Sequence, residues 1–258
     1  MVKKITPEVS ETNANCGNKK SFVGCIKTIQ RGNIYPLFPI LNFIFPVTFL
    51  AISYVLGVTG DHDISRLPYP SDLGERQPER GLFSLSLSIG VASLAPCIVF
   101  RFIQINDIGY KSQKHSNTYA FVCGMVKMVG QCFVFSYSQV ESPTAHFTGA
   151  TLYFVFGIVY IILQTQFSRK LPQHHPKWLV YMRGSFAIFA GVTFIVFFFG
   201  RILAPESESR YYIPQTCEWI IGAIFSLFVL TFSYDFHGLS CASKNMFSDE
   251  QKLRDDNI

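Results

Sequence analysis

Six long apolar stretches constrain this chain more than any other feature of its sequence. Each is about long enough to cross the hydrocarbon core of a bilayer, which takes about 20 helical residues. Charged residues make up only 15% of the chain, against about 25% in soluble domains. The stretches lie at residues 35–58, 81–102, 118–138, 145–167, 178–203 and 216–236.

These stretches predict helices rather than strands. In lipid, every backbone amide must find its hydrogen bond within its own element, and the stretches lack the alternating pattern of barrel strands. The sequence therefore predicts an all-α polytopic membrane protein whose transmembrane domain, residues 35–236, is a six-helix bundle.

The distribution of lysine and arginine predicts the orientation of that bundle. Of the 22 such residues, fourteen fall in the two tails and in the 103–117 and 168–177 loops. The opposite loops hold four: Arg66, Arg76, Arg80 and Arg210. Because positive residues accumulate on the cytosolic side, both termini are predicted to be cytosolic, with a basic tail at 1–34 and a second tail at 237–258.

Three cysteines, Cys16, Cys25 and Cys241, lie in these tails. Palmitoylation near a membrane and an unmodified thiol are both open interpretations for them. The predicted extracytosolic loops contain no cysteine pair, so we expect no disulfide framework there.

The segment PYPSDLGERQPERGLF, residues 68–83, separates the first two apolar stretches. Its prolines fix φ and cannot donate backbone hydrogen bonds, while Gly74 permits turn conformations, so we expect a compact, ordered loop. The predicted orientation places this loop at the extracytosolic end, together with ionisable residues near the span ends. The predicted luminal polar layer consists of Asp72, Glu79, His146, Arg201 and Glu218.

Structural hydrogen bonding, recognition of a ligand or lipid headgroup, and catalysis are three open roles for this layer. A carboxylate and an imidazole can transfer protons, and such groups can hold a metal. However, the residues are scattered over separate segments without metal-ligand spacing, and nothing orients a base toward Ser71 or Cys217, the available nucleophiles. We therefore expect no catalytic residue, no metal and no cofactor.

A second polar layer is predicted at the cytosolic end, formed by Arg101, Arg183 and Asp235. Arg183 and Asp235 should lie at similar depth, so either an ion pair or a headgroup contact is expected. Lys127 lies near the middle of its stretch, where an unpaired cation costs about a few kcal/mol. It should face the bundle interior, pair with a polar neighbour such as Gln131, or extend toward an interface.

Small residues on the fourth and fifth stretches predict close helix packing, because they let backbones approach one another. They are Gly149, Gly157, Gly184, Ala187, Ala190 and Gly191.

Several short motifs follow one another in a fixed order along the chain. They are Pro70-Ser71-Asp72-x-Gly74, Pro78-Glu79-x-Gly81-x-Phe83, His146-x-x-Gly149-Ala150, Gly157-x-Val159-Tyr160-x-x-Leu163-Gln164, Cys217-Glu218-Trp219, Thr231-Phe232 and Asp235-Phe236. From about Tyr35 to Phe236 this combination resembles the DRAM family of damage-regulated autophagy modulators, within the Frag/DRAM/Sfk group of six-span membrane proteins.

The resemblance implies a non-enzymatic protein of lysosomal or other endomembranes that promotes autophagy, with relatives at the plasma membrane and a Golgi location also open. It implies membrane lipids as partners, together with trafficking or autophagy proteins on the cytosolic side; nucleic acid is not an expected partner. Other branches of the group leave a lipid-handling alternative, either remodelling of GPI-anchor lipids or scaffolding of a phosphoinositide kinase. A small-solute transporter built around Lys127 is a further alternative.

Overall fold

A computed structural model describes residues 34–60, 67–108, 113–171, 175–203 and 212–237 of the chain. Within this part of the chain, six helices are long and apolar enough to cross a membrane. The prediction of an all-α, six-span membrane protein is therefore confirmed. Cys16, Cys25, Cys241 and the predicted tails, apart from Ile34 and His237, lie outside the described residues.

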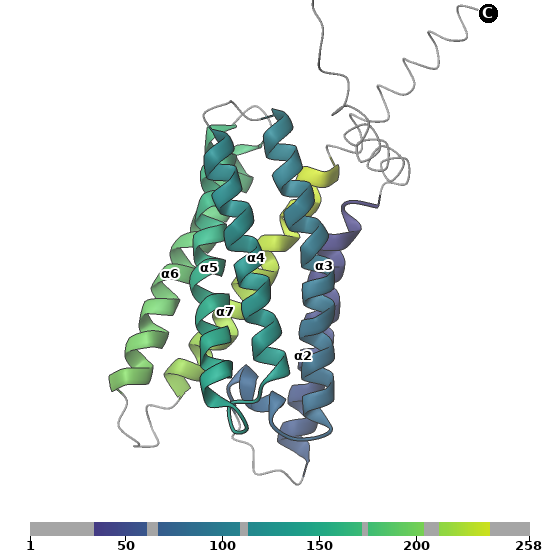
Figure 1. The fold of residues 1–258 in the computed structure, drawn as a ribbon, viewed down its shortest axis with the longest axis vertical. Coiled ribbons are helices and arrows are strands. Elements are labelled where there is room, and N and C mark those ends of the chain that lie inside the picture. The colour runs from purple at the N-terminus through teal and green to yellow at the C-terminus, as the bar shows by residue number, and fades with distance from the viewer. Residues whose placement is uncertain (1–33, 61–66, 109–112, 172–174, 204–211, 238–258) are drawn as a thin grey trace, which may run out of the picture. The chain divides into compact units, whose positions relative to one another are not determined.

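The six helices follow one another with a short 3₁₀ helix, η1, between the first two (Figure 1). After α7, a turn at Thr231 leads into a last helical segment that ends at His237. The elements are α2 (Leu37–Thr59), η1 (Pro70–Gly74), α3 (Glu79–Ile108), α4 (Lys114–Ser136), α5 (Pro143–Lys170), α6 (Lys177–Leu203) and α7 (Tyr212–Leu230).

Most of these helices extend a few residues beyond the apolar stretches that predict them. The α3 helix begins at Glu79 and continues to Ile108, because backbone hydrogen bonding continues into the polar interface after hydropathy has fallen. The α7 helix begins at Tyr212, with Pro214 in its first turn. A proline is tolerated there because the first amides of a helix have no intrahelical acceptor.

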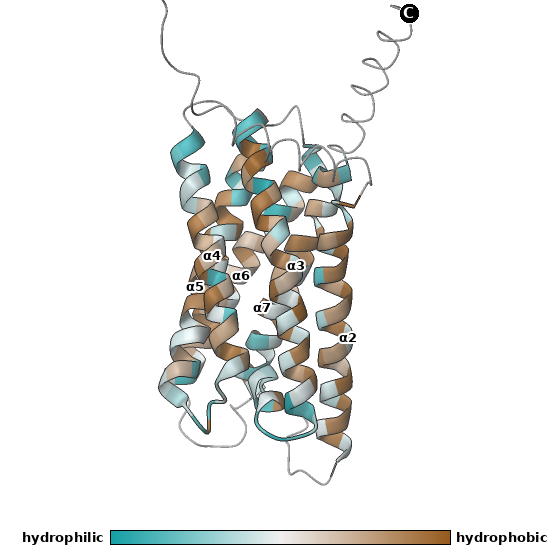
Figure 2. Cartoon of the chain, turned by 45° about the vertical axis from the view of Figure 1, so that its right-hand side comes forward, coloured by the Kyte–Doolittle hydropathy of each residue, from teal (hydrophilic) through white to brown (hydrophobic). Residues whose placement is uncertain are grey.

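The helices pack in chain order. Each of α2 to α6 contacts its successor, and α7 returns to contact α2. Figure 2 shows apolar residues along the middle of the helices and polar residues gathered toward the two ends. Large apolar side chains such as Ile188 and Phe189 on α6 are 67% and 62% exposed, as expected of helix faces that contact lipid.

Glycine permits close contact between α4 and α5, as predicted for Gly149. A Cβ atom added at Gly130 would lie 2.5 Å from the backbone nitrogen of Tyr153 and 2.7 Å from the carbonyl oxygen of Gly149. The prediction is wrong for Gly184 and Gly191 on α6, because a Cβ at either would meet nothing within 4 Å, whereas Ala190 on the same helix is fully buried. These two glycines lie next to open space and do not mark a helix contact.

We expect Gly130→Ala to lower the melting temperature of the detergent-purified protein, because the added methyl group would force the α4 and α5 backbones apart. Overpacking of this kind typically costs about 1–3 kcal/mol. Gly184→Ala is the matched control, since the methyl group has room there and alanine favours helix by about 1 kcal/mol. Equal melting temperatures for the two variants would contradict the close α4–α5 contact.

Candidate functional site

The segment at 68–83 folds over one end of the bundle, which we name the loop end. The backbone N–H of Tyr69 donates to Asp72 Oδ2 at 2.8 Å, and Gln139 Nε2 donates to Asp72 Oδ1 at 2.6 Å. Leu73 is fully buried, and a Cβ at Gly74 would lie 2.9 Å from the Phe83 ring. The predicted compact loop is therefore observed, and only glycine fits at position 74 without displacing Phe83.

The last two helices hold this loop in place. Trp219 on α7 donates its indole N–H to the carbonyl oxygen of Pro68 at 2.9 Å. The Arg201 guanidinium, near the end of α6, lies 4.9 Å from the Tyr69 ring centroid and 5.4 Å from that of Phe147. Cation–π contacts of this kind add to the attraction between Arg201 and the nearby carboxyl groups of Asp72 and Glu218.

Three members of the predicted luminal polar layer come together beneath this loop. His146, Arg201 and Glu218 line a cavity of about 340 Å³ between α5 and α6, which we name the α5–α6 cavity. His146 donates from Nδ1 to the carbonyl oxygen of Tyr137 at 2.8 Å, since a carbonyl can only accept. Ser71 provides hydrogen-bond donors to the Glu218 carboxyl.

The other two members of the predicted layer differ in position. Asp72 lies next to this group and reaches it through Gln139, which lines the α5–α6 cavity. Glu79 lies at the junction of α2 and α3, where Ser53 Oγ donates to its carbonyl oxygen at 3.0 Å. Glu79 is buried in the first turn of α3, where a negative charge interacts favourably with the helix dipole.

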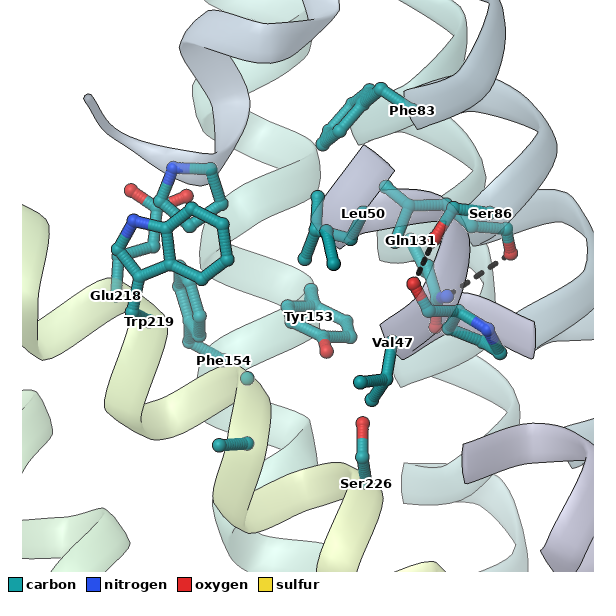
Figure 3. A pocket seen from close by; sticks show the side chains of 16 residues that line it. Val47, Leu50, Phe83, Ser86, Gln131, Tyr153, Phe154, Glu218, Trp219 and Ser226 are labelled. Carbon is teal, nitrogen blue, oxygen red and sulfur yellow. Dashed lines mark hydrogen bonds between the residues drawn. The ribbon is translucent and has the colours of Figure 1, made fainter. Parts of the chain in front are cut away.

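A second cavity, of about 280 Å³, lies within the bundle, and we name it the central cavity. Figure 3 shows Glu218 and Trp219 projecting from α7 on one side, Val47 and Leu50 from α2 on the other, and Tyr153 between them. Glu218 also lines the α5–α6 cavity, so the two cavities share this residue.

At the opposite end of the bundle, the predicted second polar layer is a closed ionic cluster, which we name the arginine cluster. Asp235 Oδ2 lies 2.6 Å from Arg183 Nη2 and 3.1 Å from Arg101 Nη1. His175 Nε2 lies 3.3 Å from Asp235 Oδ1. All four side chains are at most 1% exposed. The expected Arg183–Asp235 ion pair is present, and it is inside the protein rather than at a lipid headgroup.

Lys127 faces the bundle interior, one of the alternatives predicted for it. Its Nζ lies 4.5 Å from the Tyr153 ring centroid and 5.1 Å from that of Phe225. The suggested partner Gln131 instead donates to the carbonyl oxygen of Leu87 at 3.1 Å. Among the described residues, aromatic rings rather than a carboxylate surround the Lys127 ammonium.

Sequence reasoning missed Gln139 and His175. Gln139 connects two carboxylates, because its amide nitrogen lies 2.6 Å from Asp72 Oδ1 and 2.8 Å from Glu75 Oε1. His175 completes the arginine cluster. Both residues occur in polar connecting segments, where glutamine and histidine are ordinary, so no local signal distinguishes them.

Comparison of the sequence with known proteins identifies the family and the relatives that the chain resembles. Residues 34–239 match the family described as the Frag1/DRAM/Sfk1/Cwh43P N-terminal domain. DNA damage-regulated autophagy modulator protein 1 of Mus musculus is 26% identical over 213 residues, covering 77% of this chain and 90% of that protein. DNA damage-regulated autophagy modulator protein 2 of Homo sapiens is 28% identical and covers 73% of this chain and 79% of its own length.

A third relative carries a different name. The modulator of macroautophagy TMEM150B of Danio rerio is 28% identical over 222 residues, covering 82% of this chain and 92% of that protein. No solved structure matches the chain.

We expect the loop end to be more stable in mild acid. Burial raises the pKa of Asp72 to about 6 from its ordinary value of 3.8, and the nearby Glu75 carboxylate adds to the rise. Since the pKa of Asp72 is higher in the folded protein, its contribution to stability is complete below its ordinary pKa and is lost as the pH rises through about 6. Hydrogen exchange of residues 68–74 should therefore be slower at about pH 5 than at about pH 7.5, after correction for intrinsic exchange rates.

Asp72→Asn should reduce that pH dependence, because asparagine keeps an acceptor oxygen and does not ionise. If the variant retained the full pH dependence, another group would have to be responsible.

We expect Asp235→Asn to unfold the protein at a much lower temperature. It leaves the buried guanidinium groups of Arg101 and Arg183 without a counter-charge, and breaking a buried ion pair typically costs about 3–5 kcal/mol. Glu141→Gln is the control, because it removes an exposed ion pair, Arg80 to Glu141 at 2.8 Å, and exposed pairs contribute little. A melting temperature of Asp235→Asn equal to that of the control would show that the arginine cluster does not hold the helices together.

Proposed function

The chain belongs to the Frag1/DRAM/Sfk1/Cwh43P family, and on this premise we propose that it is a non-enzymatic modulator of autophagy embedded in a lysosomal or other endomembrane. One observation carries the proposal. The relatives named as modulators of autophagy or macroautophagy match 73–82% of this chain, and the family match at residues 34–239 includes all six membrane helices.

The contacts that the buried polar side chains make within the protein support a role without catalysis. Asp235 is enclosed between two arginines, and His146 is bound to a backbone carbonyl at the start of α5. Asp72 accepts hydrogen bonds that hold η1 in its conformation. These groups stabilise contacts between helices and hold the loop in place, and a regulator that acts by binding needs no reacting group beyond them.

We place both termini in the cytosol, because basic residues accumulate on the cytosolic side of a membrane. The loop end is then luminal, and the arginine cluster lies near the cytosolic face. Arg169, Lys170 and Lys177 at the adjoining ends of α5 and α6 would meet anionic lipid headgroups or trafficking and autophagy proteins. In an acidic lumen of about pH 5, Asp72 would be largely protonated and its loop more stable.

A lipid-handling role is the second candidate, and the two cavities favour it. Both lie among helices long and apolar enough to span a membrane, and both are lined by apolar side chains with a few polar groups.

Cells that lack the protein should show reduced autophagic flux, measured as the turnover of a lipidated autophagosome marker with and without an inhibitor of lysosomal proteolysis. Re-expression of the wild-type chain should restore the flux, whereas Asp235→Asn should not. The Glu141→Gln control should restore it. A tag on the carboxyl end should be accessible to antibody after selective permeabilisation of the plasma membrane and should coincide with a lysosomal marker.

Unchanged flux in cells without the protein, with the tagged chain at the plasma membrane or the Golgi, would contradict the autophagy proposal and favour lipid handling. A carboxyl-terminal tag that is accessible only after the organelle membrane is also opened would reverse the proposed orientation.

A further inference from the structure

The central cavity contains unfilled space next to α7. A Cβ added at Gly222, which lines the cavity, would meet nothing within 4 Å. At Gly157, a glycine used for packing on α5, a Cβ would lie 2.5 Å from the Phe225 ring. Protein interiors are close-packed, so open space of this size inside the bundle is unusual and calls for an occupant.

The cavity reaches the outer surface of the bundle. Val47 and Ala51 on α2 and Ala223 on α7 all line it, and all three are exposed residues. These helices are long and apolar enough to span a membrane, so the opening between them faces the hydrocarbon of the bilayer. The occupant is therefore a molecule that enters from lipid and is largely apolar.

The polar groups of the cavity define the head of that molecule. The Ser86 hydroxyl already donates to the carbonyl oxygen of Pro46 at 2.9 Å, and Gln131 Nε2 already donates to that of Leu87 at 3.1 Å. Among the described residues that line the cavity, Glu218 is the only carboxylic acid, and lysine, arginine and histidine do not occur. Tyr153 and Ser226 add hydroxyl groups to the lining. Glu218 already accepts from Ser71 and lies near Arg201, which lines the adjoining α5–α6 cavity and not this one. Within the central cavity, the Glu218 carboxyl is therefore the acidic group that can accept a further hydrogen bond from a ligand.

We propose that the central cavity binds a single amphiphile drawn from the bilayer, with its apolar body between α2 and α7 and a hydroxyl or amine head that donates a hydrogen bond to Glu218. Sterols and long-chain amines both have this chemistry. Fatty acids and other anionic amphiphiles do not, because their head would meet the Glu218 carboxyl, close to Asp72. This binding goes beyond the modulation of autophagy and does not depend on it.

The cavity also suggests how binding would be sensed. Glu218 lines both cavities and is contacted by Ser71 of η1, and its neighbour Trp219 holds Pro68. A ligand head that binds Glu218 would therefore contact the residues that hold the luminal loop and could change the position of that loop.

The test uses the purified full-length chain in nanodiscs of phosphatidylcholine. Three photoreactive, clickable probes are compared: a sterol, a long-chain amine and a fatty acid. The sterol, the amine or both should label the chain on peptides of α2 or α7, whereas the fatty acid should not. Gly222→Leu fills the open space, and it should reduce labelling at least about tenfold because several methylene contacts are lost.

Gly191→Leu on α6 is the matched control. Its Cβ also meets nothing within 4 Å, but the residue lines neither the central nor the α5–α6 cavity, so labelling should equal that of the wild type. Melting temperatures show whether each variant folds. Glu218→Gln then separates the two head chemistries, because glutamine cannot form the carboxylate with which a protonated amine pairs but keeps an oxygen that accepts from a hydroxyl.

Loss of amine labelling in Glu218→Gln identifies an amine ligand whose head lies at Glu218. Sterol labelling that is retained in Glu218→Gln but lost in Gly222→Leu identifies a hydroxyl ligand in the same cavity. Three results would overturn it: equal labelling of folded Gly222→Leu and Gly191→Leu, labelling that maps away from α2 and α7, or stronger labelling by the fatty acid than by the other probes.

Discussion

The pairing of Asp235 with two buried arginines is the interaction on which the rest of the structure depends. A guanidinium without a counter-charge is costly inside a membrane protein, so Arg101 on α3 and Arg183 on α6 must both reach this one carboxylate. Neutral groups complete the arrangement, since Arg101 Nε donates to Gln164 and Arg183 Nη1 donates to Ser168, both on α5. The Phe232 ring lies 5.5 Å from the Arg101 guanidinium and 5.3 Å from that of Arg183. Four helical segments therefore have their depth and rotation set at one end of the bundle.

The loop end is held differently, by one ordered segment instead of a buried ionic cluster. There η1 contacts α2, α3 and α7, and its neighbours Pro68 and Tyr69 are held by Trp219 and Arg201. Helices fixed at one end and capped at the other need not fill all the space between. The two cavities lie toward the capped end and share Glu218. The arginine cluster, which resists unfolding, and the cavities, which could take up a molecule, thus lie toward opposite ends of the bundle.

Several residues of the motifs that carry the family resemblance fall on these same two regions, whereas Gly149 and Gly157 lie at helix contacts between them. Ser71, His146 and Glu218 belong to the loop end, whereas Gln164 and Asp235 belong to the arginine cluster. These residues, far apart in the chain, are thereby explained as parts of two spatial units. One unit stabilises the bundle, and the other supports the loop and the cavities to which our functional proposals refer.

The sequence by itself determined the number and approximate limits of the membrane helices, because hydropathy over about 20 residues and backbone hydrogen bonding are local properties. It also identified the ordered loop, since the effects of proline and glycine on φ are local. Only the tertiary structure decided which polar residues meet. It placed Glu79 at the junction of α2 and α3, and it brought Gln139 to Asp72 and His175 to Asp235. It also placed Lys127 against aromatic rings instead of Gln131 and left Gly184 and Gly191 beside open space. The physical reason is that these contacts depend on the rotation and depth of each helix relative to its neighbours, which packing and buried charge set jointly and which no single stretch of the chain contains.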